Sequence, residues 1–156
     1  MDAPVATAGM LFRRPVDVVR DAFIDPEVTT KFWFTHSTGR LEPDAIVTWT
    51  WAMYGVSTEV KVKAIEPGRI VFDWDNATNP TEVEWTFADR GGHCFVEIAN
   101  RGFAADAAGV ALAIDSAGGF SLVLGAAKIW LEHGVDPRFI VDRHPDHHVT
   151  GWTEVT

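Results

Sequence analysis

The chain has 156 residues, of which 47% are hydrophobic and 22% charged, and this length is typical of one compact domain with a sizeable core. Thirteen basic residues against 22 acidic ones give a net charge of -9, which repels phosphate backbones and anionic lipids, so no nucleic-acid partner and no membrane-surface partner is expected. Cys94 is the only cysteine, which excludes an intramolecular disulfide; the N-terminus has no secretory pattern and no apolar run approaches the roughly 20 residues that span a bilayer, so we expect a cytoplasmic protein.

The N-terminal part of the chain combines one strand with two short helices. Residues 5–12 mix small and apolar side chains and predict a first strand. Residues 15–24 open with a proline and repeat apolar residues at helical spacing, which predicts a short helix. A second short helix is predicted from Asp25, which can cap it, with Pro26 in its first turn and Trp33 at its far end.

From about Gly39 the pattern repeats every two residues, as is typical of half-buried strands. Turn sequences separate the strands: Pro67 and Gly68 suit the two central places of a type II turn, and Gly91 and Gly92 close the last hairpin. Because consecutive strands are joined by hairpins, we expect an antiparallel meander. The predicted strands are residues 45–53, 56–65, 69–75, 81–88 and 93–101.

The alternation in three of these strands points their largest side chains toward one face of the sheet. Most of the residues between them are polar, so the opposite face is expected to meet water. A face this rich in tryptophan requires a cover, a ligand or both. Its residues are Val47, Trp49, Trp51, Met53, Ile70, Phe72, Trp74, Val83, Trp85 and Phe87.

An apolar helix near the end of the chain can supply the cover. Between Phe120 and Leu131 the apolar residues form one broad stripe at helical spacing. Gly134 follows and can supply the left-handed residue that ends a helix. The apolar surface is wide enough to meet the tail or a second subunit as well, so a homodimer is a reasonable expectation.

The start of that helix is less clearly marked. We expect it near residues 116–119, preceded by a separate short helix over 104–115, with Gly118 and Gly119 as a joint or a close packing point. Residues 135–156 then form a C-terminal tail that packs on the domain or extends from it. In chain order these elements predict a single α+β domain over residues 1–134, with the long helix laid across the sheet.

Short motifs add a family resemblance to this pattern. The helix that opens at Asp25-Pro26-Glu27, the turn Glu66-Pro67-Gly68 and the ending from Gly119 to Gly134 resemble the START-like superfamily, also called SRPBCC, whose fold is the helix grip. Within it the chain most resembles the branch similar to the C-terminal domain of the activator of the ninety-kilodalton heat-shock protein ATPase. That branch often has tryptophan after the glycine, where this chain has Phe120.

The resemblance implies a cavity between the curved sheet and the long helix, because relatives bind lipids, sterols, polyketides or plant hormones there. It implies a small hydrophobic ligand. No cofactor or metal is expected, because the sequence has no glycine-rich phosphate loop, Gly-x-Ser-x-Gly elbow or metalloprotease helix. The alternative is a filled core in which the rings pack against one another. The implied ligand-binding residues are Trp49, Trp51, Trp74, Trp85 and Phe87 on the sheet side, Phe120 and Leu124 on the helix side, and Trp33 at the mouth.

Two polar residues, Thr58 and Asn100, share the inward parity of their strands and are therefore candidates for the cavity interior. A buried amide without hydrogen-bond partners costs on the order of 1–3 kcal/mol. Asn100 is therefore expected to bind either a ligand or nearby backbone.

The sequence offers no evident catalytic set. His36 follows the second helix and is either an acid or base in a cleft or an exposed loop residue. His144, His147 and His148 include a His-x-x-His spacing, but zinc requires three or four converging ligands and this segment is a polar tail. Cys94 is expected to be a buried apolar residue, since no neighbouring base can be identified.

Three hypotheses for the function follow. The first is a non-catalytic module that binds a small hydrophobic or aromatic ligand. The second is an enzyme of the polyketide cyclase kind, in which the cavity shapes a flexible substrate and one or two polar residues move protons. The third is a co-regulator of a chaperone ATPase, a role for which a short acidic chain is poorly equipped. A cavity larger than about 300 Å³ supports the first two.

Overall fold

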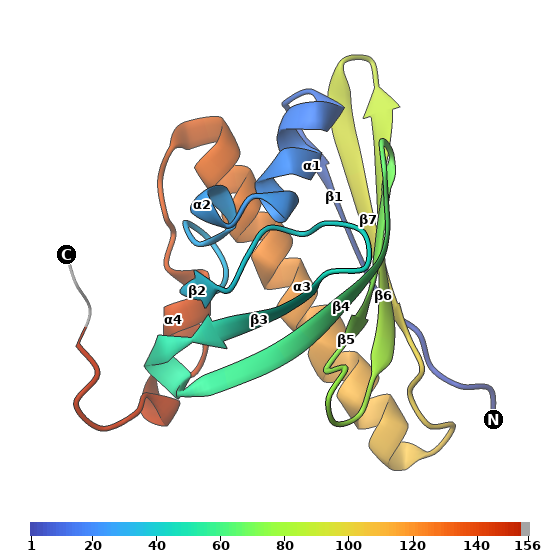
Figure 1. Ribbon diagram of the computed structural model, residues 1–156, viewed down its shortest axis with the longest axis vertical. Helices are drawn as coiled ribbons and strands as arrows, with labels where there is room; N and C mark the ends of the chain where they lie inside the picture. Colours follow the sequence, from blue (N-terminus) through green and yellow to red (C-terminus); the bar gives the residue numbers. More distant parts are fainter. Residues whose placement is uncertain (154–156) are drawn as a thin grey trace.

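One seven-stranded sheet forms the body of the computed structural model, which describes residues 1–153 (Figure 1). Its strands lie in the order β1-β7-β6-β5-β4-β3-β2, and every neighbouring pair is antiparallel. The expected antiparallel meander is therefore confirmed. The strands are β1 (Ala6–Phe12), β2 (His36–Ser37), β3 (Ile46–Trp51), β4 (Val56–Glu66), β5 (Arg69–Trp74), β6 (Thr81–Arg90) and β7 (His93–Arg101).

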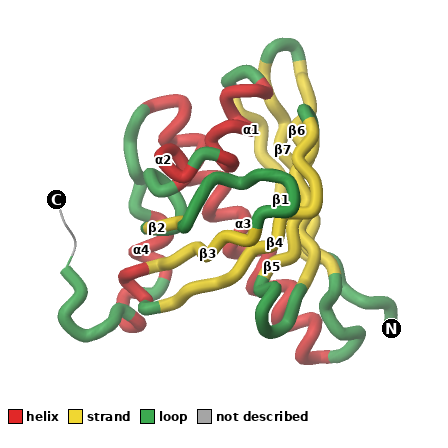
Figure 2. Tube along the Cα trace, viewed as in Figure 1, coloured by secondary structure: helices red, strands yellow, loops and turns green. Residues whose placement is uncertain are grey.

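The α-helices lie together on one side of this curved sheet, and the long α3 runs diagonally across it (Figures 1 and 2). This arrangement is the predicted α+β helix grip. The helical elements are α1 (Val16–Ile24), α2 (Pro26–Thr29), η1 (Ala52–Tyr54), α3 (Ala107–His133), α4 (Phe139–Arg143) and η2 (Pro145–His147), where η marks a 3-10 helix.

The short elements follow the local signals in the sequence, with small differences at their ends. Asp25 caps α2 as expected, because its Oδ1 accepts the backbone N–H of Glu27 at 3.0 Å. The helix ends at Thr29, so Trp33 lies in the turn beyond it rather than in its last turn. The two-residue strand β2 was not predicted, because it is too short to show an alternation.

A single helix, α3, replaces the two helices expected over residues 104–133. The side chain of Asp106 caps it by accepting the Gly109 N–H at 2.8 Å, and Gly134, with a φ of 66°, ends it. The expectation that Gly118 and Gly119 form a joint or a close packing point was wrong, because the helix continues through them and a Cβ at either position would meet nothing within 4 Å. Glycine lowers helix propensity by about 1 kcal/mol relative to alanine, but packing of the helix on the sheet outweighs so local a preference.

The continuous α3 also changes the expectation about apolar segments. By length and composition alone it could cross a membrane, whereas the sequence was expected to contain no such run. The core helix of a folded domain has the same properties, and α3 packs on β1 and β7 along one face.

The C-terminal segment packs back on the domain through the chain before β4. Tyr54 donates its hydroxyl to the carbonyl of Ile140, and the N–H of Val149 donates to the carbonyl of Met53 at 2.8 Å. Val141 of α4 is buried as a result. Residues 135–153 therefore form one end of the structure and close the site described next.

Candidate ligand cavity

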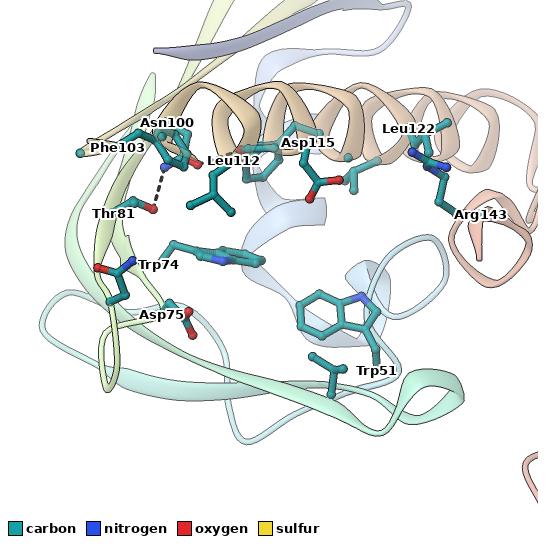
Figure 3. Close-up of a pocket in the computed structure, with 18 of the residues that line it drawn as sticks. Trp51, Trp74, Asp75, Thr81, Asn100, Phe103, Leu112, Asp115, Leu122 and Arg143 are labelled. Carbon is teal, nitrogen blue, oxygen red and sulfur yellow. Dashed lines mark hydrogen bonds between the residues drawn. The ribbon is translucent and has the colours of Figure 1, made fainter. Parts of the chain in front are cut away.

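A cavity of about 950 Å³ lies between α3, the ends of the central strands and the C-terminal segment (Figure 3). The strands contribute Trp51 and Trp74, α3 contributes Leu112 and Phe120, and α4 contributes Ile140. Parts of the chain that are distant in sequence therefore build its walls. Its volume lies in the range usual for small-molecule sites.

Aromatic rings form the inner wall of the cavity. Trp33 stacks on Trp74 with ring centroids 5.8 Å apart and an interplanar angle of 11°. Phe120 meets both indoles edge to face, at 6.0 Å and 5.9 Å. The ring centroid of Trp51 lies 6.1 Å from that of Trp33, so Trp51 belongs to the same cluster. The sheet and α3 thus touch directly through these rings, and the cavity opens beyond the contact.

The structure separates the ten predicted site residues into two groups. Those on the cavity wall are Trp33, Trp51, Trp74, Asn100 and Phe120, whereas Trp49, Thr58, Trp85, Phe87 and Leu124 pack behind the wall. Trp33 was expected at the mouth, but it is 7% exposed and lies at the centre of the ring cluster. Strand parity predicts the face on which a side chain lies, but not how far it is from the covering helix.

Asn100 is held by a network that joins the sheet to α3. Its amide nitrogen donates to Thr81 Oγ1 and to the carbonyl of Glu82, both at 2.9 Å, and its oxygen accepts the hydroxyl of Ser116 at 2.8 Å. All these hydrogen bonds are made without a ligand. The bond to the carbonyl of Glu82 agrees with the expectation that Asn100 binds nearby backbone. Asn100, Thr81 and Ser116 still line the cavity, and their polar atoms fix its shape at this end.

Thr58 acts on the cavity through Asp75. Its buried hydroxyl donates to Asp75 Oδ1 at 3.0 Å and so positions a carboxylate that lines the cavity. Asp75 follows the last residue of β5 and has a φ of 59°, a left-handed conformation that aspartate tolerates better than most residues. Nothing in the sequence pattern marked Asp75, because the bond to Thr58 joins residues of two different strand ends.

Polar side chains from α3 and the C-terminal segment complete the cavity. Asp115 projects from α3 into it, and Arg143 lies at the α4 end (Figure 3). Leu112, Asp115, Phe120 and Val123 lie on one face of α3 and line the cavity together. Leu112 and Asp115 were missed because two helices were expected over residues 104–133. In a single helix, their spacing places them on the same face as Phe120.

The histidines of the C-terminal segment separate into two environments. The rings of His144 and His147 stack with centroids 5.1 Å apart, and both residues line the cavity. His148 instead contacts the carbonyl of Val141 at 2.8 Å and the ring of Trp152. Within residues 1–153 no group of three or more histidine, cysteine or acidic side chains could hold a metal ion.

Two further candidates lie away from the cavity. His36 is exposed on β2 and does not line it. Cys94 is fully buried on β7, and burial, together with the nearby charge of Asp89, raises the pKa of its thiol to about 11. The thiol is therefore protonated at neutral pH and is a poor nucleophile.

Comparison with known proteins places this geometry in a recognised group. Residues 13–124 match the family model described as Activator of Hsp90 ATPase homolog 1-like protein. Protein SSP2350 from Staphylococcus saprophyticus has a similar structure, with a TM-score of 0.76 and 25% identity over 86% of this chain and 96% of that one. No curated protein matches the sequence.

Two other solved structures share the fold at lower identity. DynU16, a protein of the dynemicin biosynthetic locus, gives a TM-score of 0.74 at 19% identity, over 87% of this chain and 49% of its own. The Aha1 dimer from Colwellia psychrerythraea gives 0.70 at 14% identity, over 84% of this chain and 98% of that one. These likenesses support the fold.

Proposed function

Because the chain belongs to the family of activator of Hsp90 ATPase homolog 1-like proteins, which the helix-grip structure also supports, we propose that it binds a small, largely apolar or aromatic ligand in the cavity, without catalysis. The observation that carries this proposal is the cavity of about 950 Å³ with an aromatic inner wall. Tryptophan faces favour flat apolar groups, and burial of apolar surface contributes about 25 cal/mol per Å². We also propose that the protein acts in the cytoplasm.

The proposal is tested by a screen of hydrophobic ligands read by tryptophan fluorescence. Trp51 and Trp74 lie on the wall, so a bound ligand is expected to change the emission. A screen of aromatic and aliphatic compounds that gives no saturable change would contradict the proposal.

Two variants on α3 make a matched pair for any ligand that the screen identifies. Leu112 and Ile114 are both exposed apolar residues, at 54% and 68%, but only Leu112 lines the cavity. Leu112→Asn is expected to weaken binding about fivefold, because the ligand no longer covers an apolar side chain. Ile114→Asn is expected to leave the affinity unchanged. Equal losses in the two variants would place the ligand elsewhere.

Catalysis on a small molecule is a second candidate function for the same cavity. The carboxylate of Asp115 and the imidazoles of His144 and His147 line it and offer proton-transfer groups. DynU16 belongs to a biosynthetic locus, which favours small-molecule chemistry in a protein with this fold. Product formation from a ligand found in the screen, and its loss in Asp115→Asn, would support this candidate over simple binding.

Two partner hypotheses belong to the same proposal. The family description is the reason to test for a chaperone partner. The Aha1 dimer from Colwellia is the reason to test for a homodimer. Stimulation of a chaperone ATPase by the purified protein would support the co-regulator hypothesis. Sedimentation at several concentrations would show whether two copies associate.

A further inference from the structure

The charges on the cavity wall are unevenly distributed. Asp75, Asp106 and Asp115 line it, whereas the one arginine on the wall, Arg143, comes from the α4 end. The whole chain carries a net charge of -9, so the protein as a whole also attracts positively charged molecules. A ligand with a positive group is therefore favoured where it can reach the carboxylates.

These carboxylates differ in what already occupies them. Asp106 caps α3: its carboxylate accepts the N–H of Gly109 and stabilises the start of the helix. Within the described residues the carboxylate of Asp75 accepts one hydrogen bond, from Thr58, at one of its two oxygens. The carboxylate of Asp115 accepts no hydrogen bond and forms no ion pair within residues 1–153. Asp75 and Asp115 therefore retain oxygens for a donor in the cavity.

The two carboxylates belong to opposite walls. Asp75 follows β5, directly after Trp74, and Asp115 projects from α3 on the other side (Figure 3). The indole of Trp74 lies on the same wall as Asp75, while Trp33 covers one of its faces by stacking. A ligand lying on this wall meets a flat aromatic surface and an anionic group together.

This combination selects a particular class of ligand. An ammonium group is attracted to a tryptophan face by about 0.5–2 kcal/mol, depending on how far it is desolvated, and it also donates hydrogen bonds to carboxylates. An anionic group at the same place would instead be repelled by the two carboxylates, since Arg143 lies at the other end of the cavity. We propose that the ligand of this cavity is an organic cation, namely an apolar or aromatic body that carries a protonated amine, with the amine bound at Asp75 beside Trp74 and attracted across the cavity by the charge of Asp115. This inference rests on the proposed function.

The experiment compares three ligands that share one ring system and differ in charge. They are 2-naphthylmethylamine, 2-naphthylmethanol and 2-naphthoate, which are positive, neutral and negative at pH 7. Binding is followed by NMR through the indole N–H signals of the tryptophans. We expect the amine to bind at least about tenfold more tightly than the carboxylate, with the alcohol between them. Raising the salt concentration should weaken the amine alone.

Variants of the two carboxylates identify the part of the cavity responsible. Asp75→Asn keeps an oxygen that can accept the hydroxyl of Thr58, and Asp115 is exposed, so neither change removes core packing. Each is expected to weaken binding of the amine about threefold to fivefold and to leave the alcohol unchanged. Asp142→Asn is the control, because it removes the same charge from an exposed position on α4 that does not line the cavity.

The outcomes separate this inference from the proposed function. If the three ligands bind equally, or the carboxylate binds most tightly, the organic-cation inference is overturned while small-molecule binding in the cavity stands. If Asp142→Asn weakens the amine as much as Asp115→Asn, general attraction by the acidic chain explains the preference and the inference also fails. If none of the three shifts an indole signal, the proposed function fails for ligands of this size, and the inference fails with it.

Discussion

At the scale of single residues, neighbouring positions of equal parity have different roles. Trp49 and Trp51 lie on the same face of β3, yet Trp49 is 1% exposed behind the wall and Trp51 lines the cavity. Trp49 stacks on Phe34 with ring centroids 4.7 Å apart, and that contact keeps it in the core. The residue type is the same, so the difference comes from what packs above each ring.

Glu132 shows how a single carboxylate ties α3 to the first strand. Lys128 Nζ lies 2.6 Å from Glu132 Oε2 and also donates to the carbonyl of Leu11 at 2.8 Å, while the N–H of Arg13 donates to the same carboxylate. Burial acts to raise the pKa of Glu132, but the hydrogen bonds from Lys128 and Arg13 outweigh it, so the pKa lies below its ordinary value.

Removal of this charge is predicted to destabilise the fold in a pH-dependent way. A carboxylate whose pKa is lower in the folded state stabilises the protein above its unfolded pKa, and this contribution disappears as the pH falls below about 4. Glu132→Gln should therefore lower the free energy of unfolding at pH 7 by about 1–2 kcal/mol. Urea unfolding at pH 7, 5 and 3 measures the difference, which should shrink toward pH 3.

The control for this prediction is Glu97→Gln, because Glu97 is exposed on β7 and its side chain makes no hydrogen bond within the described residues. It should change the stability little at any of these pH values. A Glu132→Gln effect that is the same at pH 3 and pH 7 would count against the ionic explanation.

At the scale of elements, the continuity of α3 decides which residues reach the cavity. Asp115 and Ser116 precede the two glycines, and Phe120 and Val123 follow them, yet all four line one cavity. A bend at Gly118 or Gly119 would turn the first pair away from the second. The helix is continuous through these glycines, and a methyl group added at Gly118 would meet open space rather than a packed neighbour.

Alanine substitutions test this continuity. Gly118→Ala is predicted to raise the free energy of unfolding by about 0.5–1 kcal/mol, because alanine restricts the unfolded chain and suits a helix interior. Gly109→Ala is predicted to be strongly destabilising, because its Cβ would lie 1.8 Å from the carbonyl oxygen of Ala104. Thermal melts of the two variants measure both effects. A destabilised Gly118→Ala would favour the joint that the structure does not show.

At the scale of the whole molecule, the C-terminal segment closes the structure. The ring of Phe139 lies so close to Gly125 that a Cβ added there would be 3.4 Å from it. Tyr54 holds α4 by donating its hydroxyl to the carbonyl of Ile140. The segment also places Arg143, His144 and His147 on the cavity wall. The domain boundary expected at residue 134 remains a prediction, and these contacts argue that the two parts depend on each other.

Truncation after Gly134 is predicted to lower the free energy of unfolding by about 3 kcal/mol or more, since it exposes the apolar surface under Val141 and Phe139. It should also weaken binding of any cavity ligand. Chemical denaturation and a ligand titration measure the two effects. Tyr54→Phe removes only the hydroxyl that holds α4 and should cost about 1 kcal/mol. A truncated protein as stable as the full chain would show that the segment merely rests on the domain.

The sequence by itself determined the features that depend on neighbouring residues. Period-two alternation placed Trp49, Trp74 and Trp85 on one face of the sheet, and turn residues such as Pro67 and Gly68 set the order of the hairpins. Gly134 marked the end of α3, where it adopts the left-handed conformation that glycine favours. The motifs of these same segments carried the family resemblance, which the match over residues 13–124 confirmed.

Only the tertiary structure decided which of those residues form the cavity. Trp51 lines the cavity, whereas Trp49 does not. Thr58 positions Asp75, and Asp115 lies across the cavity from it, on α3. These relations join residues distant in the chain, and they depend on where α3 crosses the sheet and where the C-terminal segment returns. Local periodicity carries no information about either, because the packing free energy that fixes them is shared among side chains of the whole domain.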